Sequence, residues 1–548
     1  MLQLAAMLSG WLDHLQKMAF LPMLFYGAAG FGLSLIVIAL TIRFCQRKQF
    51  LARARDLHHT HKVAVPRLGG LGLAVALLVL VGLINLFNSE DAMSARQNGV
   101  FVVSTLAMFF VGFWDDLKPI GARRKMIAQV LIAATVYFLG FNIGVFKLPV
   151  SDREIQLGLW GLPITVLWLV GLTNLVNLID GVDGLAGGIC LMLMVLLAYV
   201  GGDTKLGFLA AGMTGALLGF LRFNFPPARI FMGDGGAYFL GFVIGMMTIM
   251  SSQKGTVAAA LIAPLFVLAL PIVDTSLAIF RRGIQGLPIF RPDRRHIHHR
   301  LMGMGMSSRK VVLGLYVFTL IFLTFGFLVY SSKGKMFPIL FGLGLAILLG
   351  CAGWLSFSRE WFSVGRVLGH SVEMRRDIQY ALQMLRWLEL EAARGASGES
   401  LFSDFVFILG KLGFCRVRLA MPGGEWVWQM PGSPSDCRQS RHEIHHGSSA
   451  VLELGACPQS GRPEEGAKSN GTAASGTASL PGIATEQLYE TLSDLAAEAW
   501  QKAIRRWESI NGCPLSFAEV GESKPYHVPF QLRPVRTAAK QQTQPQRS

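Results

Sequence analysis

Signatures of several common protein classes are missing from this chain of 548 residues. It has no GxxxxGK[ST] phosphate loop, no GxGxxG segment that opens a helix after a strand, and no GxSxG nucleophile elbow. These absences argue against an ATP-driven pump, a nucleotide-dependent dehydrogenase and a serine hydrolase.

Cysteine is scarce and scattered. There are seven cysteines, an odd number, and no two of them form a CxxC pair. A disulfide framework or a zinc ribbon is therefore not expected, and reduced thiols in a cytoplasmic setting are the prediction. The N-terminus shows no cleavable signal peptide, and residues 1–19 are predicted to be a short amphipathic lead-in.

Charge is also scarce, and hydrophobic residues are abundant. Only 15% of the residues are charged and 52% are hydrophobic, and the apolar residues form blocks of about 20, the length that spans a bilayer. The net charge of +16 would suggest a nucleic-acid partner for a soluble protein. Here the positive charge is concentrated in particular loops, so we expect a lipid bilayer as partner and no nucleic acid.

The sequence predicts an all-α polytopic membrane protein with about eleven transmembrane helices. The expected spans are 20–42, 68–86, 98–114, 125–142, 158–178, 185–200, 206–221, 235–251, 256–280, 311–330 and 336–357. Loops after odd-numbered spans hold 21 Lys and Arg residues, and loops after even-numbered spans hold 7. This bias predicts that the odd loops are cytoplasmic and that the N-terminus lies outside.

After residue 357 the composition changes to that of a small cytosolic α+β domain, expected over 358–522. Helices are predicted at 370–394 and 484–508, and strands at Phe405–Leu409, Cys415–Met421 and Trp426–Met430. Residues 458–482 are predicted to be a flexible loop, and 523–548 a disordered basic tail. The role of this domain cannot be read from its sequence.

Five polar clusters lie at ends of the predicted spans, all on the side assigned to the cytoplasm. They are His61–Gly70 (HKVAVPRLGG), Asp115-Asp116, Asn174–Leu185 (NLVNLIDGVDGL), Phe231–Gly236 (FMGDGG) and Arg294–Leu301 (RRHIHHRL). Ionisable groups at a bilayer boundary are costly to place and indicate a functional site. We therefore expect chemistry at a membrane surface, in a transmembrane domain covering 20–357.

The acidic clusters suit phosphate chemistry that depends on magnesium. Adjacent carboxylates such as Asp115 and Asp116 repel each other unless a cation or a proton lies between them, so they fit a magnesium site or a general base. Asp234 is flanked by glycines and could open a helix whose N–H groups meet phosphate. Magnesium often takes one or two carboxylates plus substrate phosphates, and the basic residues of 294–300 could bind a diphosphate. This combination matches phosphoryl transfer.

Each cluster also has a simpler interpretation. Asp115 and Asp116 could be a solvated helix end, and Asp234 a plain N-cap. Asn174 and Asn177 could bond another helix across the bundle. The histidines near 296–299 could bind zinc together with those near 58–61, although paired Cys/His spacing is missing. Lys62 and Arg67 could face anionic lipid.

Taken in order, the motifs HKxxxPRxGG, DD, NxxNxxDGxDGL, FMGD and HIHHRL resemble those of the polyprenyl-phosphate N-acetylhexosamine-1-phosphate transferases. The resemblance covers roughly residues 20–357. It implies an Mg²⁺-dependent membrane enzyme, with Mn²⁺ as a substitute, that moves a sugar-1-phosphate from a UDP-sugar to a polyprenyl (undecaprenyl) phosphate and releases UMP. This would be the first step of a lipid-linked surface polysaccharide pathway. The segment HIHHRL resembles the branch that uses UDP-N-acetylglucosamine.

The resemblance also implies a place and a set of partners. The enzyme would be a multi-pass protein of the inner (plasma) membrane with a cytoplasmic active site, and a homodimer is a further expectation. The closest alternative within the class is the phospho-N-acetylmuramoyl-pentapeptide transferase of peptidoglycan synthesis. A transporter is the main alternative from another class, but its acidic residues would be expected near the bilayer midplane.

Residue roles follow from the resemblance motif by motif. The residues implied to be catalytic are Asp115, Asp116, His298 and His299. Those implied to bind substrate are Lys62, Arg67, Asn174, Asp180, Asp183, Phe231, His296 and Arg300. Those implied to hold the metal are Asp234 and Asn177. Because a phosphate monoester has its second pKa near 6, the lipid phosphate is already mostly ionised, and direct attack is favoured over a covalent aspartyl intermediate.

Overall fold

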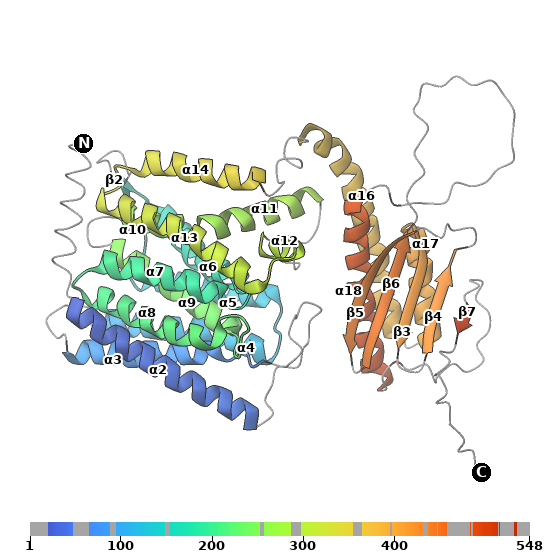
Figure 1. Ribbon diagram of the computed structural model, residues 1–548, viewed down its shortest axis with the longest axis horizontal. Coiled ribbons are helices and arrows are strands. Elements are labelled where there is room, and N and C mark those ends of the chain that lie inside the picture. The colour runs from blue at the N-terminus through green and yellow to red at the C-terminus, as the bar shows by residue number, and fades with distance from the viewer. Residues whose placement is uncertain are drawn as a thin grey trace, which may run out of the picture. The chain divides into compact units, whose positions relative to one another are not determined.

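The computed structural model describes residues 20–47, 65–87, 95–147, 154–252, 257–285, 297–354, 364–394, 397–421, 424–430, 437–446, 448–456, 483, 486–512, 515 and 531–533. They form two compact units, an apolar helical unit and a second unit made up mainly of the described residues from Val364 onward (Figure 1). The predicted boundary between 357 and 358, the lead-in 1–19 and the loop 458–482 lie outside the described residues.

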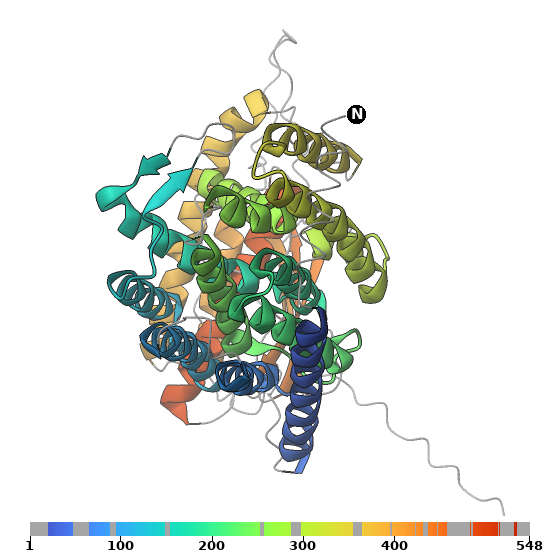
Figure 2. The ribbon, with the colours of Figure 1, turned by 90° about the vertical axis from the view of Figure 1, so that its left-hand side faces the viewer.

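The first unit is a bundle of helices, seen nearly end-on for the most part in Figure 2. Its helices are α2 (Phe20–Arg47), α3 (Gly69–Phe87), α4 (Ala95–Leu117), α5 (Ala122–Phe138), α6 (Gly161–Ile179), α7 (Leu185–Gly201), α8 (Lys205–Asn224), α9 (Gly233–Ser252), α10 (Val257–Val267), α11 (Ala269–Gln285), α12 (Ile297–Gly303), α13 (Ser308–Ser331) and α14 (Phe337–Trp354). Each predicted span overlaps a helix or, for the ninth, a helix pair.

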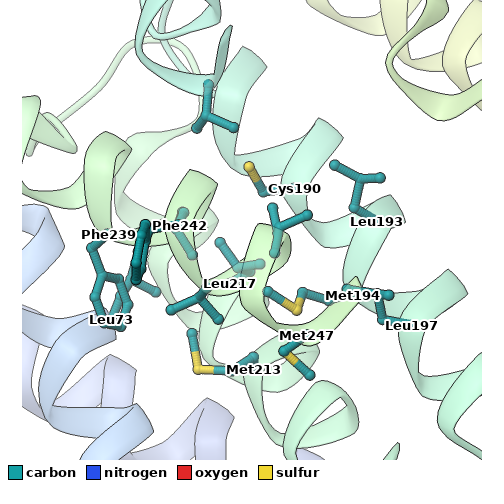
Figure 3. Packing of buried hydrophobic residues seen from close by; sticks show 14 of the residues in the cluster. Leu73, Cys190, Leu193, Met194, Leu197, Met213, Leu217, Phe239, Phe242 and Met247 are labelled. Atoms are coloured by element: carbon teal, nitrogen blue, oxygen red, sulfur yellow. The ribbon is translucent and has the colours of Figure 1, made fainter. Parts of the chain in front are cut away.

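Helix α9 is the central element of this bundle. In the most apolar 18-residue stretch of α9, 94% is buried, against 28% in the corresponding stretch of α2. Outer side chains of α2 such as Leu21 and Leu24 are exposed. Phe239, Phe242 and Met247 of α9 pack among side chains from α3, α7 and α8 (Figure 3). A helix that is apolar all round is buried, whereas helices with exposed apolar faces suit a lipid surround.

Seven helices of the described part are long and apolar enough to cross a membrane, and eight if one bent pair counts as a single span. The chain is therefore a polytopic helical protein, as predicted. Helices α5, α7 and α14 are shorter or less apolar than this criterion requires. The full number of eleven spans and their orientation remain predictions.

The ninth predicted span is wrong as a continuous helix. Helices α10 and α11 meet at Leu268 with a bend of 76°. Pro271 lies in the first turn of α11, and its missing N–H and its ring cannot continue a helix from α10. A short antiparallel hairpin, β1 (Val145–Lys147) and β2 (Glu154–Gln156), follows α5 and was not predicted from the sequence.

The second unit is an antiparallel sheet with helices, in agreement with the predicted α+β class. Its strands are β3 (Phe414–Met421), β4 (Gly424–Gln429), β5 (Arg438–His446), β6 (Ser448–Ala456) and β7 (Gln531–Arg533), in the order β5-β6-β3-β4-β7. Its helices are α16 (Val364–Glu391), η2 (Ala392–Arg394), α17 (Gly398–Lys411) and α18 (Glu486–Asn511). The core is aromatic, with Phe405 stacked on Trp500 at a centroid distance of 4.6 Å.

The predicted helices 370–394 and 484–508 and the strands Cys415–Met421 and Trp426–Met430 are confirmed within a few residues. The predicted strand Phe405–Leu409 is wrong, because these residues belong to α17. Ser397 caps that helix by accepting a hydrogen bond from Ser400 N at 3.2 Å. The buried positions on α17 recur at helical spacing, at Leu401, Phe402, Phe405, Val406, Ile408 and Leu409.

Candidate active site

Two of the predicted motifs are joined through their backbones. Phe231 N donates to Pro66 O at 2.9 Å, Gly69 N to Phe231 O at 2.9 Å, and Gly70 N to Met232 O at 3.0 Å. A side chain at Gly70 would place its Cβ 2.4 Å from Gly236 Cα. The glycines of the first motif therefore let the start of α3 lie directly against the start of α9, which carries Asp234.

Asp116 caps the N-terminus of α9. Its two carboxylate oxygens accept hydrogen bonds from Asp234 N at 3.0 Å and Gly235 N at 2.9 Å. A carboxylate is stabilised there by the unpaired N–H groups and by the helix dipole. The DD motif is thus no solvated helix end, and the cap on α9 is supplied by Asp116. The catalytic role implied for Asp116 stays a prediction.

Because Asp116 provides the cap, the carboxylate of Asp234 is left to meet other side chains. Asn177 Nδ2 donates to Asp234 Oδ1 at 3.0 Å, and Lys125 Nζ lies 3.0 Å from Asp234 Oδ2. The side chain of Asp234 is 30% exposed, so a ligand can reach it. Asp234 and Asn177, which the sequence assigned to one metal site, are neighbours in the fold.

Lys125 is a site residue that the sequence analysis did not single out. It lies on the first turn of α5, and its Nζ is 2.8 Å from Asp115 Oδ2 as well as 3.0 Å from Asp234 Oδ2. Asp115 Oδ1 accepts a further bond from Ile120 N at 2.9 Å. In the sequence, Lys125 counts only as one of the 21 basic residues of the odd-numbered loops. The available signal was its position ten residues after Asp115.

The loop after α6 brings two more carboxylates to this region. Asp180 is partly buried, and burial followed by repulsion from Asp234 and Asp116 raises its pKa well above the ordinary value, while Arg67 opposes the rise. Asp183 Oδ2 accepts a bond from Ala228 N at 2.9 Å. The cluster therefore has more acidic groups than nearby cations and would gain from an added positive charge.

Asn174 behaves as its simpler interpretation predicted. Its Nδ2 donates to Gln129 Oε1 on α5 at 2.6 Å and to Val170 O at 2.8 Å. The first bond joins α6 to α5, and the second lies within α6, one turn before Asn177. The substrate-binding role implied for Asn174 stays a prediction.

One residue of the histidine motif lies beside the acidic loop. His298 on α12 is buried, and its Nε2 is 3.4 Å from the point where a Cβ on Gly181 would stand. Asp274 Oδ1 accepts a bond from Ile297 N at 3.3 Å and so holds the start of α12. His298 and Asp274 are among the residues that line a small, mostly apolar cavity of about 40 Å³ between α6, α7, α11, α12 and α13.

Not every predicted site residue can be placed. Lys62 and His296 lie outside the described residues, as does the side chain of His299. Arg300 is partly buried on α12, and Phe231 is partly buried at the backbone junction with Pro66. The structure brings together Asp115, Asp116, Asn177, Asp180, Asp234 and the nearby Arg67, with His298 adjoining them through Gly181.

Within the described part of the chain, no three His, Cys, Asp or Glu side chains are grouped so that they could hold a metal ion. The acidic groups nevertheless suit Mg²⁺, which takes oxygen ligands and commonly only one or two carboxylates, with phosphates and water completing the shell. The ammonium of Lys125, placed between two carboxylates, shows that this point favours positive charge.

Comparison with known proteins gives a consistent picture. The pattern of glycosyl transferase family 4 matches residues 98–252. A probable undecaprenyl-phosphate N-acetylglucosaminyl 1-phosphate transferase of Bacillus subtilis is 35% identical over 265 residues, which are 48% of this chain and 72% of the relative. A decaprenyl-phosphate N-acetylglucosaminephosphotransferase of Mycobacterium tuberculosis is 31% identical over 48% of this chain and 71% of its own.

A phospho-N-acetylmuramoyl-pentapeptide-transferase of Clostridium botulinum is 30% identical over 321 residues, which are 55% of this chain and 94% of the relative. The matched motifs, the helical bundle and these relatives agree. The chain belongs to the polyprenyl-phosphate N-acetylhexosamine-1-phosphate transferase family.

Proposed function

We propose that this protein transfers N-acetylglucosamine-1-phosphate from UDP-N-acetylglucosamine to a polyprenyl phosphate at the cytoplasmic face of the membrane and releases UMP. The observation that carries the proposal is the meeting of Asp115, Asn177 and Asp234 around Lys125, with Asp180 beside them, at the start of the buried helix α9. Charged groups gathered at a helix end, with apolar helices around them, can serve one water-soluble and one lipid substrate.

Asp234 is the residue that would hold Mg²⁺, or Mn²⁺ in its place, with Asn177, whose amide already meets the Asp234 carboxylate, as its helper. When bound, the ion would neutralise charge on the diphosphate. Asp116 supports this site indirectly, because its cap on α9 fixes the backbone that carries Asp234. The two carboxylates of the DD motif would thus have different tasks.

The lipid phosphate needs charge shielding more than a strong base, since it is largely ionised near neutral pH. Lys125 stands between Asp115 and Asp234 and would pair with incoming phosphate oxygens. Asp115 would orient the attacking oxygen and take any residual proton. The groups of α12, His298 and Arg300, would balance the charge that develops on the departing UMP. One phosphoanhydride replaces another, so the reaction should be close to balanced and reversible.

The identity of the donor sugar rests on two observations. The segment Arg294–Leu301 has the HIHHR pattern of the N-acetylglucosamine branch. The Bacillus relative, whose name states an N-acetylglucosaminyl transfer, is 35% identical, against 30% for the Clostridium relative. The second candidate is phospho-N-acetylmuramoyl-pentapeptide transfer, which is favoured by the 94% coverage of that relative.

A donor panel tests the proposal. Purified protein in detergent is mixed with Mg²⁺ and a polyprenyl phosphate, and UMP release is followed with each of several UDP-sugars. Release with UDP-N-acetylglucosamine is the expected result. Release with the muramyl-pentapeptide donor alone would support the second candidate. Absence of release with every donor would contradict both candidates and favour a transporter.

A further inference from the structure

Two thiols of the second unit lie against each other. Cys415 Sγ and Cys437 Sγ are 3.3 Å apart. Cys415 is buried in β3 where its pairing with β6 shifts register, and Cys437 is partly exposed just before β5. An S–S bond of about 2.05 Å would require these sulfur atoms to approach by only about 1.3 Å.

We propose that Cys415 and Cys437 form an intramolecular disulfide when a small-molecule disulfide is supplied. The thiolate of Cys437, the more accessible of the two, attacks one sulfur of the small disulfide and displaces a small thiolate. The thiolate of Cys415 then attacks the Cys437 sulfur of the mixed disulfide and displaces the second small thiolate. The two protein thiols are oxidised, the small disulfide is reduced, and the two protons end on the released thiols.

The bond would join the start of β5, an edge strand, to the central strand β3. It would close a loop over residues 415–437 that contains β4. Closing such a loop restricts the unfolded chain, so oxidation should raise the melting temperature of the second unit by roughly 5–10 °C.

Peptide mapping of the oxidised full-length protein tests this pairing. Trypsin cuts after Lys411, Arg416, Arg418 and Arg438, which places the two cysteines on peptides 412–416 and 419–438. Treatment with oxidised glutathione should give these two peptides linked, about 2 Da lighter than their reduced sum. Cys437→Ser should abolish the linked pair, and Cys190→Ser, a buried thiol of the other unit, should leave it unchanged. A stable glutathione adduct on Cys437, or its pairing with a different cysteine, would overturn the proposal.

A separate set of contacts concerns the start of α13. Arg309 Nε donates to Pro226 O at 2.7 Å, and Tyr316 OH donates to Gly184 O. These two side chains are seven residues apart and so lie on the same face of the helix, two turns from each other. One helix therefore holds two different loops by their carbonyl oxygens.

Both loops carry residues of the proposed site. The first holds Asp180 and Asp183, and the second runs from residue 225 to Phe231. Asn224 also links them, because its Oδ1 accepts from Gly184 N at 3.0 Å and its Nδ2 donates to Ile230 O at 2.9 Å. The fit around Tyr316 is close: a Cβ on Gly188 would lie 2.1 Å from its hydroxyl oxygen.

We infer that Arg309 and Tyr316 are positioning residues for these two loops, 180–184 and 225–232, which would help to bind the nucleotide sugar. This inference rests on the proposed function. They act through the backbone of Gly184 and Pro226. Helix α12, which carries His298, leads into α13 through a short connection. The position of α13 therefore affects both His298 and the two loops. Loss of the hydrogen bonds from Arg309 and Tyr316 to these two carbonyl oxygens should weaken binding of the donor more than it slows the reaction of the bound substrate.

The chain offers a matched control for this inference. Tyr330 lies on the same helix and donates to Val200 O at 3.1 Å, at the other end of the bundle. Tyr316→Phe should raise the KM for the UDP-sugar about three- to tenfold with kcat within about twofold, the loss expected for one hydrogen bond. Tyr330→Phe should leave both constants unchanged.

Gly188→Ala should reproduce the KM increase by displacing the Tyr316 ring, whereas Gly314→Ala, which meets no neighbouring atom within 4 Å, should not. Equal KM values for Tyr316→Phe and Tyr330→Phe in an active enzyme would overturn the positioning role alone. Wild-type protein that transfers nothing from any donor would overturn the proposed function, and this inference with it.

Discussion

The surroundings of Lys125 are the strongest indication of phosphate chemistry at this site. Its ammonium lies within 3.0 Å of carboxylate oxygens from α4 and α9, and the ring of Tyr238 has its centroid 5.9 Å away. A lysine held between two carboxylates keeps its positive charge, which an anionic substrate can use once it enters. In phosphoryl transfer, positioned cations account for a large part of the rate.

Replacing Lys125 by Met should lower transfer by about 100-fold or more, a loss typical of a group that stabilises charge in the transition state. Lys118→Met, at an exposed lysine just after α4, is the control and should keep full activity. Initial rates of UMP release by the two purified variants make the comparison. Near-normal activity of Lys125→Met would show that this ammonium is structural.

Asp234→Ala and Asp115→Asn should each abolish transfer while the protein stays in the membrane. The first change removes the carboxylate that we assign to the metal, and the second removes the group assigned to the attacking oxygen. Membrane extraction and gel filtration check that each variant is inserted and folded. Full activity of correctly inserted Asp234→Ala would refute the metal assignment.

At the scale of elements, the crossing of α4 and α9 sets the position of the site. A Cβ on Gly112 would stand 2.3 Å from Asp234 O and 2.6 Å from Gly235 N. These are backbone atoms and cannot turn aside as a flexible side chain would. The same crossing lets Asp116, one turn after Gly112, reach the N–H groups of α9.

Gly112→Ala should therefore destabilise the bundle by about 1–3 kcal/mol, the usual cost of overpacking, and should also reduce transfer strongly. Gly99→Ala is the matched control on the same helix, because a Cβ there meets nothing within 4 Å. Thermal unfolding in detergent and UMP release are measured for both. Equal stability and activity of Gly112→Ala and Gly99→Ala would contradict the role given to this helix crossing.

Much of the architecture could be predicted from the sequence, because long apolar blocks and polar clusters at their ends are local patterns. The pairing of Lys125 with Asp234 spans 109 positions and depends on how α5 and α9 are rotated, which no local pattern reveals. The break between α10 and α11 was missed although Pro264 and Pro271 were visible in the run. The apolar segment Phe405–Leu409 is compatible with either a strand or a buried helix. The N-cap at Ser397 is the feature that favours the helix.

At the scale of the whole molecule, the candidate site lies at one end of the helical unit. Helix α8 runs from Lys205 to Asn224, and Asn224 contacts the loop at Gly184 beside the site. A helix of this length covers about 30 Å, so the start of α8 lies about one bilayer thickness from the carboxylates. A site at one end suits an enzyme that meets its lipid at the membrane surface.

Labelling of introduced cysteines tests the orientation in a background without the native cysteines. Lys118→Cys, in the exposed loop after α4, should react with a membrane-impermeant maleimide in inverted vesicles and be protected in intact spheroplasts. Asp203→Cys, exposed just before α8, should show the opposite pattern. Labelling of both from the same side would contradict the proposed topology.

The most direct test of the central claim follows the phosphorus that the proposed reaction transfers. UDP-N-acetylglucosamine labelled with ³²P in the phosphate attached to the sugar is incubated with the purified protein, Mg²⁺ and polyprenyl phosphate. We expect the label in the lipid product, in a pyrophosphate linked to the sugar, with unlabelled UMP released. Label that leaves as UDP, with an unlabelled sugar on the lipid, would contradict the account.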